Sequence, residues 1–220
     1  MKKVLGSFLL VAVQLVFAQS TRNVGEFSSL KVYDKIKITL VKSDNARVEL
    51  PQDNPDVETI NKNGELKIRM APAMILQGGN ISVKVYYENL NDIQASQGSS
   101  ISAEDELDAR MLTLVSNEGS TIDARVNTAN LNVKSNSGGE VKLTGIAENQ
   151  DVLVSAGGKY FGETVESETA KVTANAGAVA VVTVTGSVNA TTRAGGIIDI
   201  YGDPEQRKVR NVIGGKINFK

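Results

Sequence analysis

The sequence lacks cysteine, histidine and tryptophan altogether over its 220 residues. Without cysteine there can be no disulfide, lipid-modified cysteine anchor, thiolate metal site or cysteine nucleophile. Without histidine the chain loses the commonest general base and the commonest transition-metal ligand. The fold must therefore be held together by burial and hydrogen bonding. We expect no catalytic residues, no cofactor and no metal centre.

Long apolar runs are also lacking, apart from one at the start of the chain. Lys2 and Lys3 precede the almost wholly apolar stretch Val4 to Phe17, and Val16-Phe17-Ala18 suits a signal peptidase. The stretch has 14 residues, whereas a membrane-spanning helix needs about 20, which argues against an uncleaved anchor. We predict a signal peptide over residues 1–18 and no stable membrane insertion. The protein is expected to be exported to the periplasm, the cell surface or the extracellular medium.

Excess charge of either sign is small. The chain has 24 basic and 25 acidic residues, and removal of Lys2 and Lys3 with the signal would leave 22 and 25, a net charge of −3. No basic block is present to neutralise phosphates, so nucleic acid is not an expected partner.

What the sequence does contain is a repeat anchored on glycine. Seven glycines each follow a pair of residues that is mostly small or polar, at spacings of 21, 19, 19, 20, 18 and 19 residues. These turn glycines are Gly98, Gly119, Gly138, Gly157, Gly177, Gly195 and Gly214. A fixed period near 19 residues is typical of a solenoid whose rungs stack.

Apolar residues keep a constant register with those glycines. Five positions before them stand Ile93, Leu114, Val133, Val152, Val172, Ala190 and Val209, and three positions after them stand Ile101, Ile122, Val141, Tyr160, Ala180, Ile198 and Ile217. The flanking segments alternate between apolar and polar residues, and no helical stripe persists. Residues 91–220 are therefore predicted to form the rungs of an all-β, single-stranded parallel β-helix with one strand on each side of every turn.

The preceding residues 19–90 carry strand patterns without that register. Lys35 to Val41, Arg47 to Leu50, Glu65 to Met70 and Asn80 to Tyr86 all alternate. Asn63-Gly64 between two such runs predicts a tight hairpin. We expect these strands to form an N-terminal β layer, antiparallel in part and continuous with the solenoid, that caps its first rung. Their pairing is left open.

Several motifs in order resemble the auto-transporter adhesins with a head GIN domain, which are exported β-helix proteins of Bacteroidetes. The resemblance rests on Phe27 to Val32, Ile36 to Leu40, Val48 to Leu50, Asn63 to Ile68, Ile81 to Val85 and the glycine repeats ending at Gly214 to Asn218. It covers nearly all of the chain after the signal and implies a right-handed parallel β-helix. It supplies no catalytic motif, and no segment after Gly195 is long enough for a membrane barrel.

Two groups of acidic residues are candidates for a calcium site and for a glycoside-cleaving site. Glu104, Asp105, Glu106 and Asp108 could hold Ca²⁺, but they lack the glycine spacing of a calcium loop, and a solvated loop is the simpler interpretation. A polysaccharide-cleaving enzyme would need two carboxylates facing one groove. Asp123 and Asp199 share a column but lie four rungs apart, roughly 19 Å at the stacking distance of parallel strands, which is too far.

A third feature is a group of apolar residues at positions that should face solvent. They are Phe161, Val179, Val181, Ile197 and Tyr201. A contiguous apolar patch on an exported protein indicates an interaction surface, for self-association first and glycan contact second. The alternative is that a bulge shifts the register and buries these residues, because Val179 to Val184 is apolar at nearly every position.

These observations predict an exported, non-enzymatic β-helix that presents a regular face to a cell-surface component, a glycan or another copy of itself. A structural envelope protein and a polysaccharide-cleaving β-helix enzyme are the alternatives.

Overall fold

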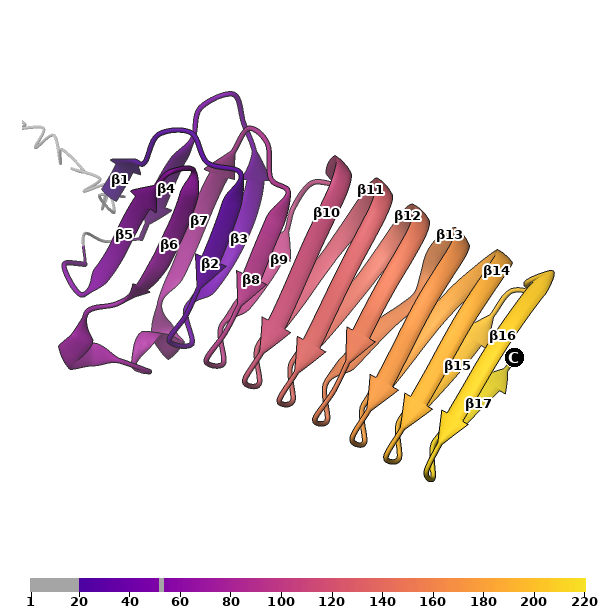
Figure 1. Ribbon diagram of the computed structural model, residues 1–220. Helices are drawn as coiled ribbons and strands as arrows, with labels where there is room; N and C mark the ends of the chain where they lie inside the picture. The colour runs from indigo at the N-terminus through magenta and orange to yellow at the C-terminus, as the bar shows by residue number, and fades with distance from the viewer. Residues whose placement is uncertain (1–19, 52–53) are drawn as a thin grey trace, which may run out of the picture.

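The computed structural model describes residues 20–51 and 54–220, which form an elongated solenoid of β-strands (Figure 1). The signal peptide predicted for residues 1–18 lies outside the described residues. Two short 3-10 segments, η1 (Pro72–Met74) and η2 (Gly78–Asn80), are the only helical elements in the described part of the chain. The prediction of an all-β parallel β-helix is confirmed.

The strands are short at the N-terminus and long in the repeat. The first nine are β1 (Ser20–Asn23), β2 (Ser29–Val32), β3 (Lys37–Lys42), β4 (Arg47–Leu50), β5 (Val57–Lys62), β6 (Glu65–Met70), β7 (Ser82–Tyr87), β8 (Asp92–Ala95) and β9 (Ser100–Ala103). The others are β10 (Leu107–Asn117), β11 (Thr121–Asn136), β12 (Glu140–Val154), β13 (Lys159–Asn175), β14 (Val179–Arg193), β15 (Ile197–Tyr201), β16 (Gln206–Val212) and β17 (Lys216–Phe219).

Each rung contributes to two sheets that meet at the glycine turn. The pre-turn sheet contains, in spatial order, β5, β6, β2, β8, β10, β11, β12, β13, β14 and β16. The post-turn sheet contains β1, β4, β7, β3, β9, β11, β12, β13, β14, β15 and β17. The long strands belong to both sheets because each begins after one turn and ends before the next (Figure 1).

Like residues stack into columns along the solenoid, as the repeat predicts. Val133 lies directly opposite Val152, and Val152 lies opposite Val172. All three side chains are fully buried. Because a β-strand points successive side chains to opposite faces, a constant register keeps the apolar residues of every rung inside.

The seven turn glycines adopt the left-handed conformation, with φ between 71° and 80°. The residue before each of them also has a positive φ, as a two-residue turn of this kind requires. A side chain at Gly157 would project into open space. The steric restriction applies to the next residue, Gly158, whose Cβ would lie 2.3 Å from the carbonyl oxygen of Ser135.

The N-terminal strands fold back into the solenoid in an order that differs from the chain. β5 and β6 form the antiparallel hairpin predicted at Asn63-Gly64, with Lys62 opposite Glu65. β2 then lies between β6 and β8, and Leu30 is opposite both Leu66 and Ile93. The rung made by β2 and β3 is thus flanked on both sides by rungs that come later in the sequence.

Candidate binding surfaces

The apolar patch predicted from the sequence lies on the outer side of the post-turn sheet. Its members are Phe161 on β13, Val179 and Val181 on β14, and Ile197 and Tyr201 on β15. All five are half-buried, whereas their neighbours in the chain, such as Ala180 and Ile198, are buried in the core.

The pairing of strands places four of these side chains next to one another, and Tyr201 lies beyond them at the edge of the patch. Phe161 lies opposite Val181, and Val179 lies opposite Ile197. Tyr201 lies opposite Thr183 on the same strand as the two valines. The irregularity in pairing between β13 and β14 begins only after Gly162, so it does not change which way the patch residues face.

Charged residues surround the patch. Lys142 is the neighbour of Phe161, Lys159 the neighbour of Val179, Asp199 the neighbour of Val181 and Lys216 the neighbour of Ile197. Glu140 contacts Lys142 at 2.8 Å and Lys159 at 3.6 Å. The hydrogen bond from Lys142 holds the pKa of the Glu140 carboxyl below its usual value, so this part of the rim stays charged. An apolar centre with a charged rim is the usual organisation of a protein contact surface.

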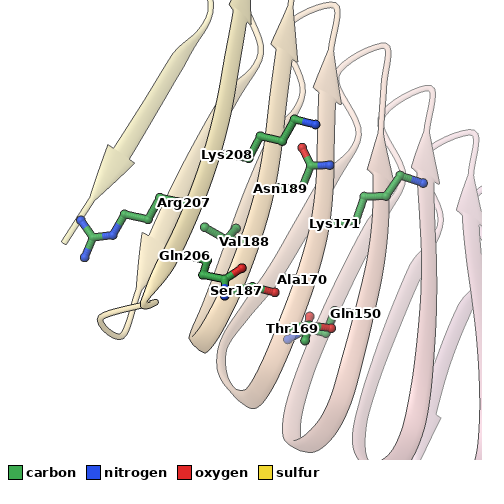
Figure 2. A pocket seen from close by; sticks show the side chains of 10 residues that line it. All are labelled: Gln150, Thr169, Ala170, Lys171, Ser187, Val188, Asn189, Gln206, Arg207 and Lys208. Atoms are coloured by element: carbon green, nitrogen blue, oxygen red, sulfur yellow. The ribbon is translucent and has the colours of Figure 1, made fainter.

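The pre-turn sheet carries a groove of about 490 Å³ that runs across four rungs (Figure 2). Its lining comes from equivalent positions of successive strands: Gln150, Thr169, Ala170, Lys171, Ser187, Val188, Asn189, Gln206, Arg207 and Lys208. Figure 2 shows the amino groups of Lys171 and Lys208 and the amide of Asn189 projecting outward from three neighbouring strands.

The outward-facing side chains of the groove are polar or basic. They belong to Thr169, Lys171, Ser187, Asn189, Gln206 and Lys208, and no acidic residue is among the lining residues. Lys171 pairs with Asp151 at 3.0 Å beside the groove. Thr169 donates a hydrogen bond of 2.7 Å to Asn149. Sequence reasoning missed this groove because a column of polar side chains looks like any solvated face; the recurrence of Lys171 and Lys208 at the same repeat position was the available signal.

The acidic residues of the proposed calcium cluster point to different partners. Glu104 pairs with Lys84 at 3.2 Å, and Glu106 pairs with Arg125 at 2.8 Å. Asp105 accepts a hydrogen bond of 2.9 Å from the backbone of Lys42. Asp108 lies in β10. Within residues 20–51 and 54–220, no three carboxylate side chains converge on a point that could hold a metal ion.

The two carboxylates considered for glycoside cleavage are separated as expected. Between Asp123 and Asp199 the same column contains Lys142, Phe161 and Val181. Asp199 accepts a hydrogen bond of 2.6 Å from Asn218. These two aspartates therefore do not face each other across a substrate site.

Comparison with known proteins identifies the family. A family described as "Putative auto-transporter adhesin, head GIN domain" matches residues 26–204. The chain belongs to the head GIN domain family. No protein with curated information matches the chain.

Several crystal structures share the fold of this head GIN protein at low sequence identity. A protein from Bacteroides fragilis described as a putative adhesin is 18% identical, with a TM-score of 0.84, over 92% of this chain and 96% of that one. A putative adhesin from Parabacteroides merdae is 17% identical, with a TM-score of 0.66, over 92% and 95% of the two chains. A putative lipid binding protein from Parabacteroides distasonis is 16% identical, with a TM-score of 0.67, over 92% and 96%.

The family name denotes adhesion rather than catalysis, and none of these three crystal structures is described as an enzyme. In the part of the chain that the structure describes, no helix is long and apolar enough to span a membrane.

Proposed function

We propose that this head GIN protein is an exported, non-catalytic binding protein whose contact surface is the apolar patch on the post-turn sheet. The observation that carries the proposal is the contiguity of Phe161, Val179, Val181 and Ile197 on the outer face of three adjacent strands. An adhesin-like role also agrees with the description of the family.

The patch suits a protein surface better than a small molecule. It lies on the face of a rigid sheet rather than in a cavity, and a charged rim surrounds its apolar centre. The simplest partner is a second copy of the chain, because two identical patches would cover each other. Burial of the patch between two copies would remove its apolar surface from water.

Sedimentation velocity tests the proposal. The wild-type protein should sediment as an oligomer at micromolar concentration, and the Phe161→Lys, Val181→Lys double variant should sediment as a monomer. The double variant Asn127→Lys, Thr144→Lys is a matched control, because both of these residues are exposed and lie outside the patch. Identical masses for the wild type and the patch variant would rule out self-association through this surface.

The groove on the pre-turn sheet favours a second candidate function, recognition of an acidic glycan. Its lysine, hydroxyl and amide side chains lie along the solenoid axis over three rungs, so an extended chain of carboxylated sugars could contact several of them. Polygalacturonate should bind with an affinity that falls as salt rises. The Lys171→Gln, Asn189→Ala variant should bind at least fivefold more weakly.

The same experiment distinguishes binding from turnover. Incubation of polygalacturonate with the protein should leave its chain length unchanged. Appearance of reducing ends or unsaturated products would instead identify a polysaccharide-cleaving enzyme.

A further inference from the structure

The last rung of the solenoid has free edges. Within the described residues, β16 pairs only with β14 and β17 pairs only with β15 (Figure 1). Every other rung of the repeat is paired on both sides. The outward backbone N–H and C=O groups of β16 and β17 can therefore pair with a further strand.

The core is also uncovered at this rung. Val209 continues the column of Val172 and Ala190, which are fully buried, yet it is 52% exposed. Ile213, at the tip of the last turn, is 82% exposed and has a φ of 57°.

The core is covered at the opposite end of the molecule. Leu50, Val57 and Met70, which lie at that end, are at most 3% exposed. Arg22 donates hydrogen bonds to the backbone carbonyls of Asn54 and Val57, so its side chain occupies acceptors at the edge of β5. Within the described residues, the inward-facing side chains are therefore covered at the N-terminal end and exposed at the C-terminal end.

The open rung is strongly basic. It carries Arg207, Lys208, Arg210, Lys216 and Lys220, and neither β16 nor β17 contains an acidic residue. Arg207 pairs with Asp203, and Lys220 lies 3.7 Å from Asp199. Lys208, Arg210 and Lys216 form no ion pair within the described residues.

The positive charge of β16 distinguishes two possible partners for its free edge, a second copy of this chain and a strand of a different protein. If two copies paired β16 with β16 antiparallel about Val209, Lys208 of one copy would face Arg210 of the other, and like charges directly opposite each other destabilise a strand pair. A partner strand with acidic residues on its outer face would instead complement both side chains. An apolar residue between them would cover Val209, since side chains alternate along a strand.

The geometry points to β16 as an acceptor for strand addition: it binds an extended segment of a partner protein in which acidic residues alternate with apolar or small ones. This inference concerns a different surface from the apolar patch and does not depend on it.

A short peptide serves as the probe. Fluorescein-labelled Glu-Thr-Glu-Val-Glu-Thr-Glu places valine over Val209 and glutamates beside Lys208 and Arg210. It should bind the purified protein in fluorescence anisotropy, and the same peptide with lysine for glutamate, or with proline for valine, should bind at least tenfold more weakly. Equal binding of all three peptides would overturn the proposal.

Variants and hydrogen exchange test the location. The Lys208→Glu, Arg210→Glu double variant should bind the acidic peptide at least tenfold more weakly than the wild type and should bind the lysine peptide more tightly. Lys134→Glu, at an exposed position on the same sheet, is the control and should change neither affinity. Amides of β16 should gain protection from exchange when the acidic peptide is bound. Binding without added protection in β16, or protection of β16 by self-association in the absence of peptide, would each contradict the proposal.

Discussion

The hydroxyl of Tyr160 donates a hydrogen bond of 2.7 Å to the side-chain oxygen of Gln150 inside the apolar core. Tyr160 is fully buried and Gln150 is 3% exposed. The ring occupies a column in which the next rung places the small residue Ala180. Gly162 is required beside it, because a Cβ there would lie 2.3 Å from the hydroxyl. One large polar residue is thus accommodated by two small ones and one hydrogen-bond partner.

Replacement of Tyr160 by phenylalanine should destabilise the fold. The change leaves the buried oxygen of Gln150 without its donor, which costs about 1–3 kcal/mol. Urea unfolding at pH 7 measures the loss. Tyr160→Phe combined with Gln150→Leu should recover part of it, because both polar groups are then removed. Tyr201→Phe, at a half-buried position on the surface, is the control and should change the free energy of unfolding little.

Stability should fall at alkaline pH, and Tyr87 should be one cause. Its hydroxyl is buried and has no hydrogen-bond partner among the described residues. Burial, with Asp105 nearby, raises the pKa of Tyr87 from 10.0 to about 12. Above pH 10 the unfolded chain loses this proton while the folded chain keeps it, so folding stability is complete below pH 10 and declines up to pH 12.

Tyr87→Phe tests that assignment. The variant should be at least as stable as the wild type at pH 7, since it removes an unpaired buried hydroxyl. Between pH 10 and 12 its free energy of unfolding should fall by about 2 kcal/mol less than that of the wild type. Burial also raises the pKa of Tyr160, so some alkaline loss should remain. If the free energy of unfolding, measured by urea unfolding at each pH, fell equally steeply in the Tyr87→Phe variant and the wild type, Tyr87 would not be responsible.

Gly158 should tolerate substitution much less well than Gly157. A Cβ at Gly158 would lie 2.3 Å from the carbonyl oxygen of Ser135, and neither backbone can move without disturbing the stack. Gly158→Ala should therefore cost about 3 kcal/mol or more. At Gly157 the space is open and φ is 73°, so Gly157→Asn should cost at most about 1 kcal/mol, because asparagine tolerates this conformation. Thermal unfolding of the two variants compares them, and equal losses would contradict the steric explanation.

Asp34 should stabilise the loop between β6 and β7. Its buried carboxylate accepts hydrogen bonds from the backbone of Met70 at 3.0 Å and of Leu76 at 3.2 Å. Asp34→Ala should cost about 2–4 kcal/mol, since it leaves two backbone donors without that partner. Hydrogen exchange should accelerate at residues 70–78. Asp44→Ala, at an exposed turn, serves as the control and should leave exchange in this loop unchanged.

The outward orientation of the patch was predictable because it depends on local alternation. In β14, Val179 and Val181 are half-buried while Val182 and Val184 are fully buried, although all four are valines. Only the distance from the turn glycine distinguishes the two kinds of position in the sequence, and it does so correctly. The role of the patch in binding stays a prediction. The alternation of positions along a strand determines which way a side chain faces, but not which molecule covers it.

The order of the N-terminal rungs could not be predicted. Leu30 would be equally well buried beside several apolar neighbours, and a strand pattern does not state which strand lies next to it. In the structure it packs between Leu66 and Ile93, so the rung of β2 and β3 precedes in sequence both of the rungs that flank it. Pairing between segments distant in sequence depends on the energy of the whole stack rather than on any single segment.

The period near 19 residues, the inward columns and the turn positions of this protein were determined by its sequence alone, because each rung repeats the same local pattern at the same distance. Only the tertiary structure decided that β2 inserts between β6 and β8, that Gly158 rather than Gly157 is sterically restricted, and that Tyr160 finds Gln150. Those outcomes depend on atoms brought together from different rungs, and a one-dimensional pattern contains no distance between them.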